Sequence, residues 1–183
     1  MGALHSSHQR FADLQRSALP DAVNHADVAV RVGGTDGCLR VGHAAPAVGY
    51  LLVTSFSQDR CGGLPRAFDA ALSRLGDVRA LVVDARPNTG GDELIARQIA
   101  GRFVGASVAY AKHEVRDASG GFGPLQTRVL DPVPPRLTVP VAVVVGPADM
   151  SSCEAFLLMM RAAGARLVGE RTLGAQATRW TAK

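Results

Sequence analysis

Residues 79–91 read Arg-Ala-Leu-Val-Val-Asp-Ala-Arg-Pro-Asn-Thr-Gly-Gly, and their pattern indicates the fold class. Its apolar part, residues 79–84, is short and continuous, which is typical of a strand in a sheet covered on both faces. The strand leads through a polar loop, ending in Gly90 and Gly91, into a helix expected over residues 93–103. A strand, a loop and a helix in this order form the repeating unit of an α/β fold.

The same order recurs further along the chain. A second buried strand is expected over residues 139–146 and a second helix over 151–163, and residues 166–169 form a short third strand. The remaining elements are predicted as a helix over 1–18, strands over 27–32, 38–42, 49–56 and 107–115, a helix over 65–75, and a Gly- and Pro-rich excursion over 116–138. A ligand site is expected where the strand ends meet the helix N-termini.

Composition excludes several classes of protein. A chain of 183 residues, 47% hydrophobic and 20% charged, is one globular domain or slightly more. Its net charge of +4 comes from scattered arginines, which argues against a nucleic-acid partner. The longest apolar run, residues 139–145, contains Pro140, so no membrane span is predicted. No secretory signal is visible, which leaves the compartment open.

The cysteines predict neither a metal site nor a disulfide framework. Cys38, Cys61 and Cys153 cannot form a closed set of pairs, and their spacing matches no zinc pattern. Unpaired thiols would fit a reducing compartment. Cys153 lies at a helix N-terminus, where a thiol can be reactive, but a small buried residue facing the strand is the favoured interpretation.

Residues 146–154, Gly-Pro-Ala-Asp-Met-Ser-Ser-Cys-Glu, have two interpretations. Ser151 and Glu154 have the spacing of a capping box, in which each side chain bonds the backbone amide of the other residue. Alternatively, the Ser151 hydroxyl is a nucleophile at the positive end of a helix dipole, with the amide of Ser152 available to bind an oxyanion. Sequence alone leaves both open.

The Gly90–Gly91 pair and the N-terminal histidines complete the candidate set. The glycines form either a plain turn or an oxyanion hole; a phosphate cradle is excluded because no Lys-Ser/Thr follows and no GxGxxG spacing is present. A serine nucleophile needs a base. The chain offers two lysines and five histidines, and residues 4–8, Leu-His-Ser-Ser-His, are either solvated or supply that base.

Four segments together resemble the S41 family of serine peptidases: residues 49–56, residues 81–91, Met150-Ser-Ser-Cys-Glu154 and residues 168–174. They follow the family's order and cover most of residues 40–175. The resemblance implies a ClpP/crotonase-like α/β core over 21–183, preceded by a helical segment over 1–20 that carries the Ser-His pair. No region resembles a PDZ domain, and the core looks truncated at its C-terminus.

The resemblance also implies roles for residues. In the family's Ser-Lys design a lysine follows the Gly-Glu-x-Thr-x-Gly segment, and this chain has Ala175 there. In the tricorn-like design the base is a histidine preceded by a serine. Ser151 would then be the nucleophile, His8 the base and Ser7 the residue that orients it. The amides of Gly90, Gly91 and Ser152 would bind the oxyanion.

The implied activity is hydrolysis of a peptide or protein substrate by acyl transfer, with no cofactor and no metal. The tricorn-like design also uses an acid well downstream of the serine, and no such position is matched; Glu170 is interpreted as structural. A binding module for an apolar ligand or peptide that has lost catalysis is therefore the main alternative, and acyl-CoA chemistry a weaker one.

The sequence predicts a peptide or protein substrate but no preference among such substrates. Arg86 or Arg102 could hold a substrate carboxylate, and residues 121–123, Gly-Phe-Gly, could form a rim over the site. Relatives with this core assemble, which leaves homo-oligomers open. The resemblance favours an extracytoplasmic location.

Overall fold

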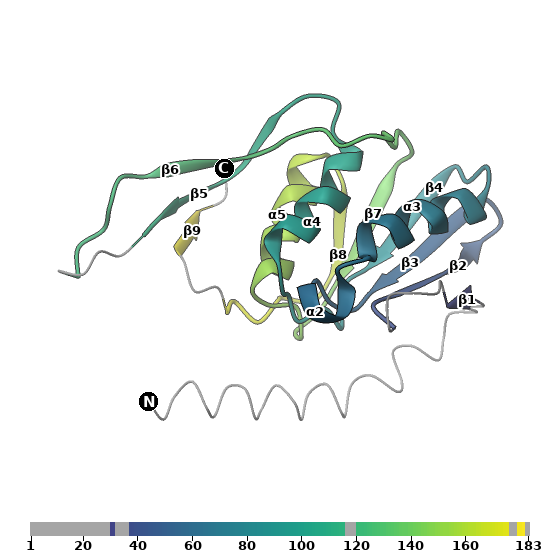
Figure 1. The fold of residues 1–183 in the computed structure, drawn as a ribbon, viewed down its shortest axis with the longest axis horizontal. Helices are drawn as coiled ribbons and strands as arrows, with labels where there is room; N and C mark the ends of the chain where they lie inside the picture. Colours follow the sequence, from purple (N-terminus) through teal and green to yellow (C-terminus); the bar gives the residue numbers. More distant parts are fainter. Residues whose placement is uncertain (1–29, 32–36, 116–119, 176–178, 182–183) are drawn as a thin grey trace.

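The computed structural model describes residues 30–31, 37–115, 120–175 and 179–181. They form a six-stranded sheet, a smaller three-stranded sheet and a layer of helices (Figure 1). The predicted α/β class is confirmed. The helix predicted over residues 1–18, with His8 and Ser7, lies outside the described residues.

Four of the six strands of the larger sheet are parallel neighbours. Its order is β1-β2-β3-β4-β7-β8, in which β3, β4, β7 and β8 are mutually parallel and β1 and β2 are antiparallel. The strands are β1 (Val30–Arg31), β2 (Leu39–Ala45), β3 (Val48–Val53), β4 (Ala80–Asp84), β7 (Val141–Val145) and β8 (Arg166–Gly169).

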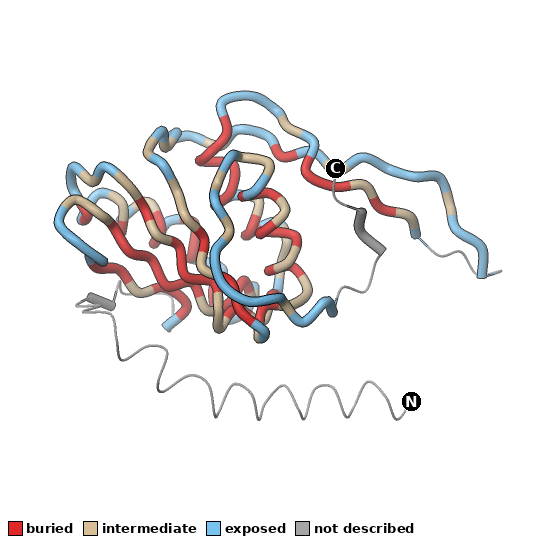
Figure 2. The backbone as a smooth tube through the Cα atoms, turned by 180° about the vertical axis from the view of Figure 1, so that it is seen from behind, coloured by how far each residue is buried: buried red, intermediate tan, exposed pale blue. Residues whose placement is uncertain are grey.

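The helices cover one face of this sheet (Figures 1 and 2). They are α2 (Gln58–Cys61), α3 (Leu64–Leu75), α4 (Glu93–Ala100), the 3-10 turn η1 (Gly101–Phe103) and α5 (Ser152–Ala162). Leu81 and Val143 are buried on the covered face, whereas Val82 and Val144 are only half-buried. The prediction that both faces of these strands are covered is therefore wrong for the described residues, because their helices pack on one side.

A second sheet projects from the body as an arm (Figure 1). It has the order β6-β5-β9, with β5 (Val108–Glu114), β6 (Gln126–Leu130) and β9 (Arg179–Thr181). Strand β6 lies inside the predicted irregular excursion, and β9 was not predicted. Phe122 is exposed in the connection between β5 and β6, and the rim over the site stays a prediction.

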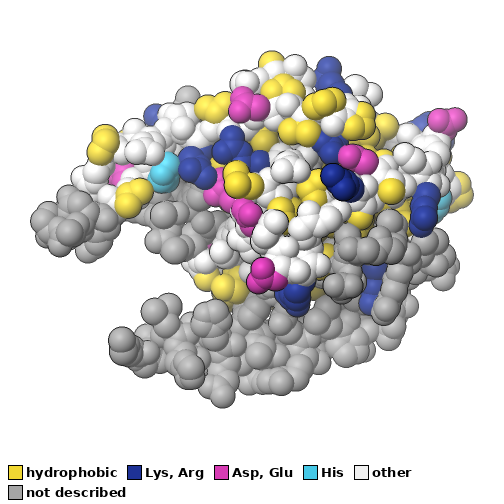
Figure 3. All heavy atoms as spheres, in the orientation of Figure 1, with side chains coloured by type: hydrophobic (Ala, Val, Ile, Leu, Met, Phe, Trp, Pro, Cys, Tyr) yellow, Lys and Arg dark blue, Asp and Glu magenta, His cyan; other side chains and the backbone are white. Residues whose placement is uncertain are grey.

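Both charge signs occur on the surface seen in Figure 3, where basic and acidic side chains lie close together among hydrophobic ones. Among the described residues no helix is long and apolar enough to cross a membrane.

The C-terminal ends of β3, β4, β7 and β8 lie at one edge of the sheet, together with α2 and the N-terminus of α5 (Figure 1). Three loops meet at this edge: residues 85–92 after β4, residues 146–151 after β7, and residues 170–175 after β8. The predicted candidate residues Gly90, Gly91, Ser151 and Ser152 all belong to these loops or border them.

Candidate active site

Ser151 has an unusual backbone conformation. Its φ of 55° and ψ of −129° lie outside the regions that L-residues prefer, and among the described residues only Ala47 shares a positive φ without being a glycine. Such strain persists only where the surrounding structure fixes it, and it is concentrated at functional sites. The residue occupies the turn that connects β7 with α5.

The capping-box interpretation is wrong. The Ser151 side chain makes no capping bond to α5. Glu154 points elsewhere: its Oε1 accepts hydrogen bonds from Thr172 Oγ1 and from the Gly174 amide, both at 2.7 Å. Glu154 therefore fastens residues 172–174 to the first turn of α5.

The two adjacent glycines are required by close backbone contacts. A Cβ on Gly90 would lie 2.7 Å from Met150 O and 2.9 Å from Ser151 Cβ, and φ of Gly90 is +87°. A Cβ on Gly91 would lie 2.3 Å from the Ser57 nitrogen. The loop after β4 is thus pressed against the Ser151 turn on one side and the end of β3 on the other.

Hydrogen bonds orient the peptide groups of this loop. The Phe56 amide donates to Gly90 O at 2.9 Å, and the Asp92 amide donates to Phe56 O at 2.7 Å. The Gly91 N–H is trans to the Gly90 carbonyl and so points away from Phe56. Among the described residues no acceptor is found for the amides of Gly91 and Ser152.

The Gly90 amide differs from these two. It donates to Asn88 Oδ1 at 2.8 Å, so this structure gives it a partner already. Gly90 allows the glycine loop to approach Ser151 closely. The amides of Gly91 and Ser152 are available to donate to an oxygen atom of a ligand.

Several buried polar atoms on the glycine loop, the serine turn and the first turn of α5 lack partners in the described part of the chain. Among the described residues, Asn88 Nδ2, Asp149 Oδ1, Ser152 Oγ and Glu154 Oε2 are buried and lack a hydrogen bond. Asn88 and Asp149 are both 0% exposed. Sequence reasoning missed both residues, because an Asn and an Asp in polar loops are typical of ordinary turns.

The surroundings of the Asp149 carboxyl disfavour its charged form. Its Oδ2 accepts the Gly146 amide at 3.0 Å. Burial, with smaller contributions from the nearby Asp84 and Glu154, raises the pKa of Asp149 to about 8. The protonated form of this carboxyl therefore persists to a higher pH than in an ordinary aspartate.

The two arginines suggested for substrate binding both pair with carboxylates; Arg86 keeps 38% of its side chain exposed, whereas Arg102 is buried. Arg86 Nε donates to Asp84 Oδ1 at 2.9 Å, and Asp84 also accepts the Tyr50 hydroxyl at 2.6 Å. Arg102 is buried, and its guanidinium donates two hydrogen bonds of 2.7 Å to the Asp69 carboxylate. These pairs hold the fold together around β4 and α3.

The cysteine prediction is corrected by the structure. Cys38 and Cys61 form a disulfide with a Cα–Cα distance of 5.9 Å, which ties the start of β2 to the end of α2. Cys153 is free and 0% exposed, as expected for a buried residue. Burial, together with Asp149 and Glu154, raises the pKa of its thiol, so it is not a reactive group.

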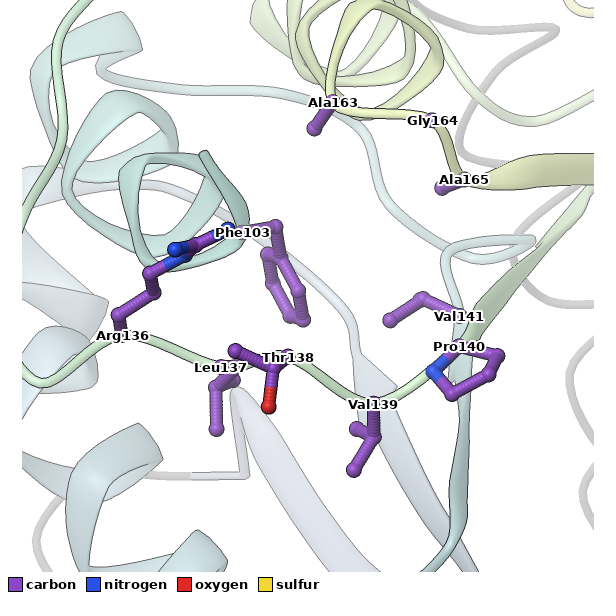
Figure 4. A pocket seen from close by; sticks show the side chains of 10 residues that line it. All are labelled: Phe103, Arg136, Leu137, Thr138, Val139, Pro140, Val141, Ala163, Gly164 and Ala165. Carbon is purple, nitrogen blue, oxygen red and sulfur yellow. The ribbon is translucent and has the colours of Figure 1, made fainter. Parts of the chain in front are cut away.

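One cavity, of about 280 Å³, lies at the opposite edge of the sheet (Figure 4). It is lined by Phe103, residues 136–141 and residues 163–165. Residues 163–165 follow the C-terminus of α5, and 11 helical residues rising 1.5 Å each put that end about 16 Å from Ser151. The cavity is therefore separate from the Ser151 edge. The described residues include no group of three or more potential metal ligands.

Ser7 and His8 lie outside the described residues, so the predicted base is not placed. Ala175 is exposed and directly follows Gly174, whose amide is bonded to Glu154. The position of the lysine in the Ser-Lys design is thus near the start of α5 and carries no base.

Known structures share this fold. A candidate peptidase from Parabacteroides merdae ATCC 43184 matches with a TM-score of 0.70 at 24% identity, over 78% of this chain and 46% of that one. CPAF in complex with lactacystin matches with a TM-score of 0.64 at 14% identity, over 79% and 46% of the two chains. The photosystem II D1 C-terminal processing protease matches with a TM-score of 0.53 at 23% identity, over 70% and 31%.

The chain spans less than half the length of each of these solved proteins. No curated protein sequence matches it. The model of peptidase family S41 matches residues 47–183, which include both glycine and serine loops. Because this match covers most of the chain, the protein belongs to peptidase family S41.

Proposed function

We propose that this chain is the catalytic core of a serine peptidase, with Ser151 as nucleophile, His8 as general base and Ser7 orienting that histidine. The observation that carries the proposal is the setting of Ser151. It has a strained positive φ at the N-terminus of α5, lies against Gly90, and adjoins the amides of Gly91 and Ser152, which have no acceptor in the described part of the chain.

The reaction proceeds by acyl transfer. His8 removes the proton from Ser151 Oγ as that oxygen attacks the carbonyl carbon of the scissile peptide. The tetrahedral intermediate then collapses, the C–N bond breaks, and His8 gives the proton to the leaving amine. Water, activated in turn by His8, attacks the acyl-enzyme and releases the second product.

The amides of Gly91 and Ser152 supply the electrostatic stabilisation of the transition state in this proposal. They meet the negative charge that develops on the carbonyl oxygen, and the positive end of α5 adds to their effect. They are held in place before the substrate arrives, since the Phe56–Gly91 contact fixes one loop and the first turn of α5 fixes the other. The loss of one such donor typically costs about 10²–10³ in rate.

Peptides or proteins are the proposed substrates. The peptide bond is the bond that the S41 family's chemistry addresses, and the mechanism above needs no metal ion or cofactor. The base comes from the N-terminal segment in this proposal because Ala175 offers no amine.

Hydrolysis of a fluorogenic peptide library tests the proposal. We expect turnover by the full chain and a loss of at least about 10³-fold in Ser151→Ala. Ser73→Ala, which alters an exposed serine on α3, is the matched control and keeps its activity. Unchanged hydrolysis in Ser151→Ala would refute the assignment. A folded chain without turnover that binds apolar ligands saturably would favour the binding module.

A further inference from the structure

Asp149 connects all three loops at the active edge. Its Oδ2 accepts the Gly146 amide at 3.0 Å, and its own amide donates to Gly146 O at 3.1 Å, which closes the turn before Ser151. Its carbonyl accepts the Leu173 amide at 3.0 Å. Its carboxyl also lies against the backbone of Asn88 in the glycine loop. The placement of Ser151, two residues later, depends on these contacts.

Burial disfavours a negative charge on the Asp149 carboxyl and outweighs the backbone groups of Gly146 and Asn88, which favour it. It is 0% exposed, and Oδ1 has no hydrogen-bond partner among the described residues. The ionisable groups that act on it are the carboxyls of Asp84 and Glu154, and the Cys153 thiol lies nearby. None of these is a cation. A buried carboxylate with one unsatisfied oxygen and acidic neighbours is strongly disfavoured.

We propose that Asp149 is a positioning residue that holds the Ser151 turn in its reactive conformation only while its carboxyl keeps its proton. The inference rests on the proposed function. Release of that proton puts a negative charge beneath the turn, where it repels the developing oxyanion and strains the contacts to Gly146 and Asn88. The reactivity of Ser151 therefore falls on the alkaline side.

Labelling of Ser151 by a fluorophosphonate, measured between about pH 6 and pH 9.5, tests this inference. In the parent chain the rate rises as His8 loses its proton and then falls above about pH 8, by about tenfold per pH unit, following the pKa of Asp149. In Asp149→Asn the side chain has nearly the shape of aspartate but cannot ionise. The labelling rate of this variant therefore reaches a plateau at high pH. Glu170→Gln, an exposed acid on the neighbouring loop, is the control and keeps the alkaline fall.

A second readout does not depend on catalysis. The pKa of Asp149 lies above its unfolded value of 3.8, so its proton stabilises the folded chain fully below pH 3.8, and this contribution is lost as pH rises towards 8. The denaturation midpoint of Asp149→Asn relative to the parent should therefore rise across this window and level off above it. Asp149→Ser is a second neutral variant for both measurements.

The two readouts separate the possible failures. A parent chain that is never labelled refutes the proposed function, and the denaturation curves then still decide whether Asp149 is protonated. A parent rate that stays flat above pH 8, or an alkaline fall that persists in both neutral variants, overturns the inference. A midpoint difference that does not change with pH overturns it as well.

Discussion

A Cβ atom on Gly90 would lie 2.9 Å from Cβ of Ser151, closer than real Cβ atoms approach other heavy atoms. The glycine loop after β4 and the serine turn after β7 therefore touch with no room for a methyl group. This contact between the loops of neighbouring parallel strands holds the glycine loop directly against Ser151, the proposed nucleophile.

Gly90→Ala should abolish the reactivity of Ser151, because the added methyl displaces the serine turn. We expect a loss of at least about 10² in the rate of fluorophosphonate labelling, comparable to the loss of an oxyanion donor. Gly164→Ala is the matched control: its φ of +90° is close to the +87° of Gly90, but nothing lies within 4 Å of its Cβ position. Both variants carry a conformational cost of about 1–2 kcal/mol, and equal labelling in the two would contradict the contact argument.

Glu154→Ala should release residues 172–174 from α5, since it removes both 2.7 Å bonds. We expect the Gly174 amide to exchange its hydrogen at least about tenfold faster, together with a loss of about 1–3 kcal/mol in unfolding free energy. Glu154→Gln keeps one acceptor oxygen and should retain most of the protection. Amide exchange followed by mass spectrometry decides this, and unchanged exchange at Gly174 in Glu154→Ala would show that Glu154 does not fasten this segment.

Thiol titration should find no reactive cysteine in the folded chain, one after unfolding, and three after unfolding and reduction. Cys38 and Cys61 are paired, and Cys153 is buried with a raised pKa. Cys38→Ser should lower the unfolding free energy by about 2–4 kcal/mol, because the disulfide closes a loop with a sequence separation of 23. Three thiols in the unreduced, unfolded chain would exclude the disulfide.

Arg102→Ala should destabilise the fold rather than alter the recognition of substrate. Its guanidinium is buried and bonds Asp69 and Pro134 O, so truncation removes three charge-assisted hydrogen bonds and costs about 1.5–3 kcal/mol. Arg74→Ala, at an exposed position on α3, should cost less than about 0.5 kcal/mol. Chemical denaturation compares the two; a cost for Arg102→Ala no larger than that for Arg74→Ala would refute the structural role.

Sequence patterns predicted most of the core. The apolar strands around Val83 and Val143 and the helices that follow them were predicted to within a few residues, because a continuous apolar run next to a polar loop has few other outcomes. Strands β6 and β9 were missed because their partners are distant in sequence and their composition is polar. Short helix α2 has too few residues for a periodic signal.

For the site, sequence indicated where the chemistry lies but not how the side chains pair. Ser151 and Glu154 have capping-box spacing, and only the folded chain shows that Thr172 and Gly174 compete successfully for the Glu154 carboxylate. Asp149 and Asn88 carry no local signal of burial, because neighbours from three loops cover them. The Cys38–Cys61 pair likewise depends on the packing of α2 against β2, which no spacing rule predicts.

The central claim is that Ser151 is an activated nucleophile. The most direct measurement is to treat the full chain with a fluorophosphonate and to identify the modified residue by peptide mass. We predict a single adduct on Ser151, absent from Ser151→Ala and formed much more slowly in His8→Ala. A folded chain that gains no adduct, or gains it on another serine, would contradict the account.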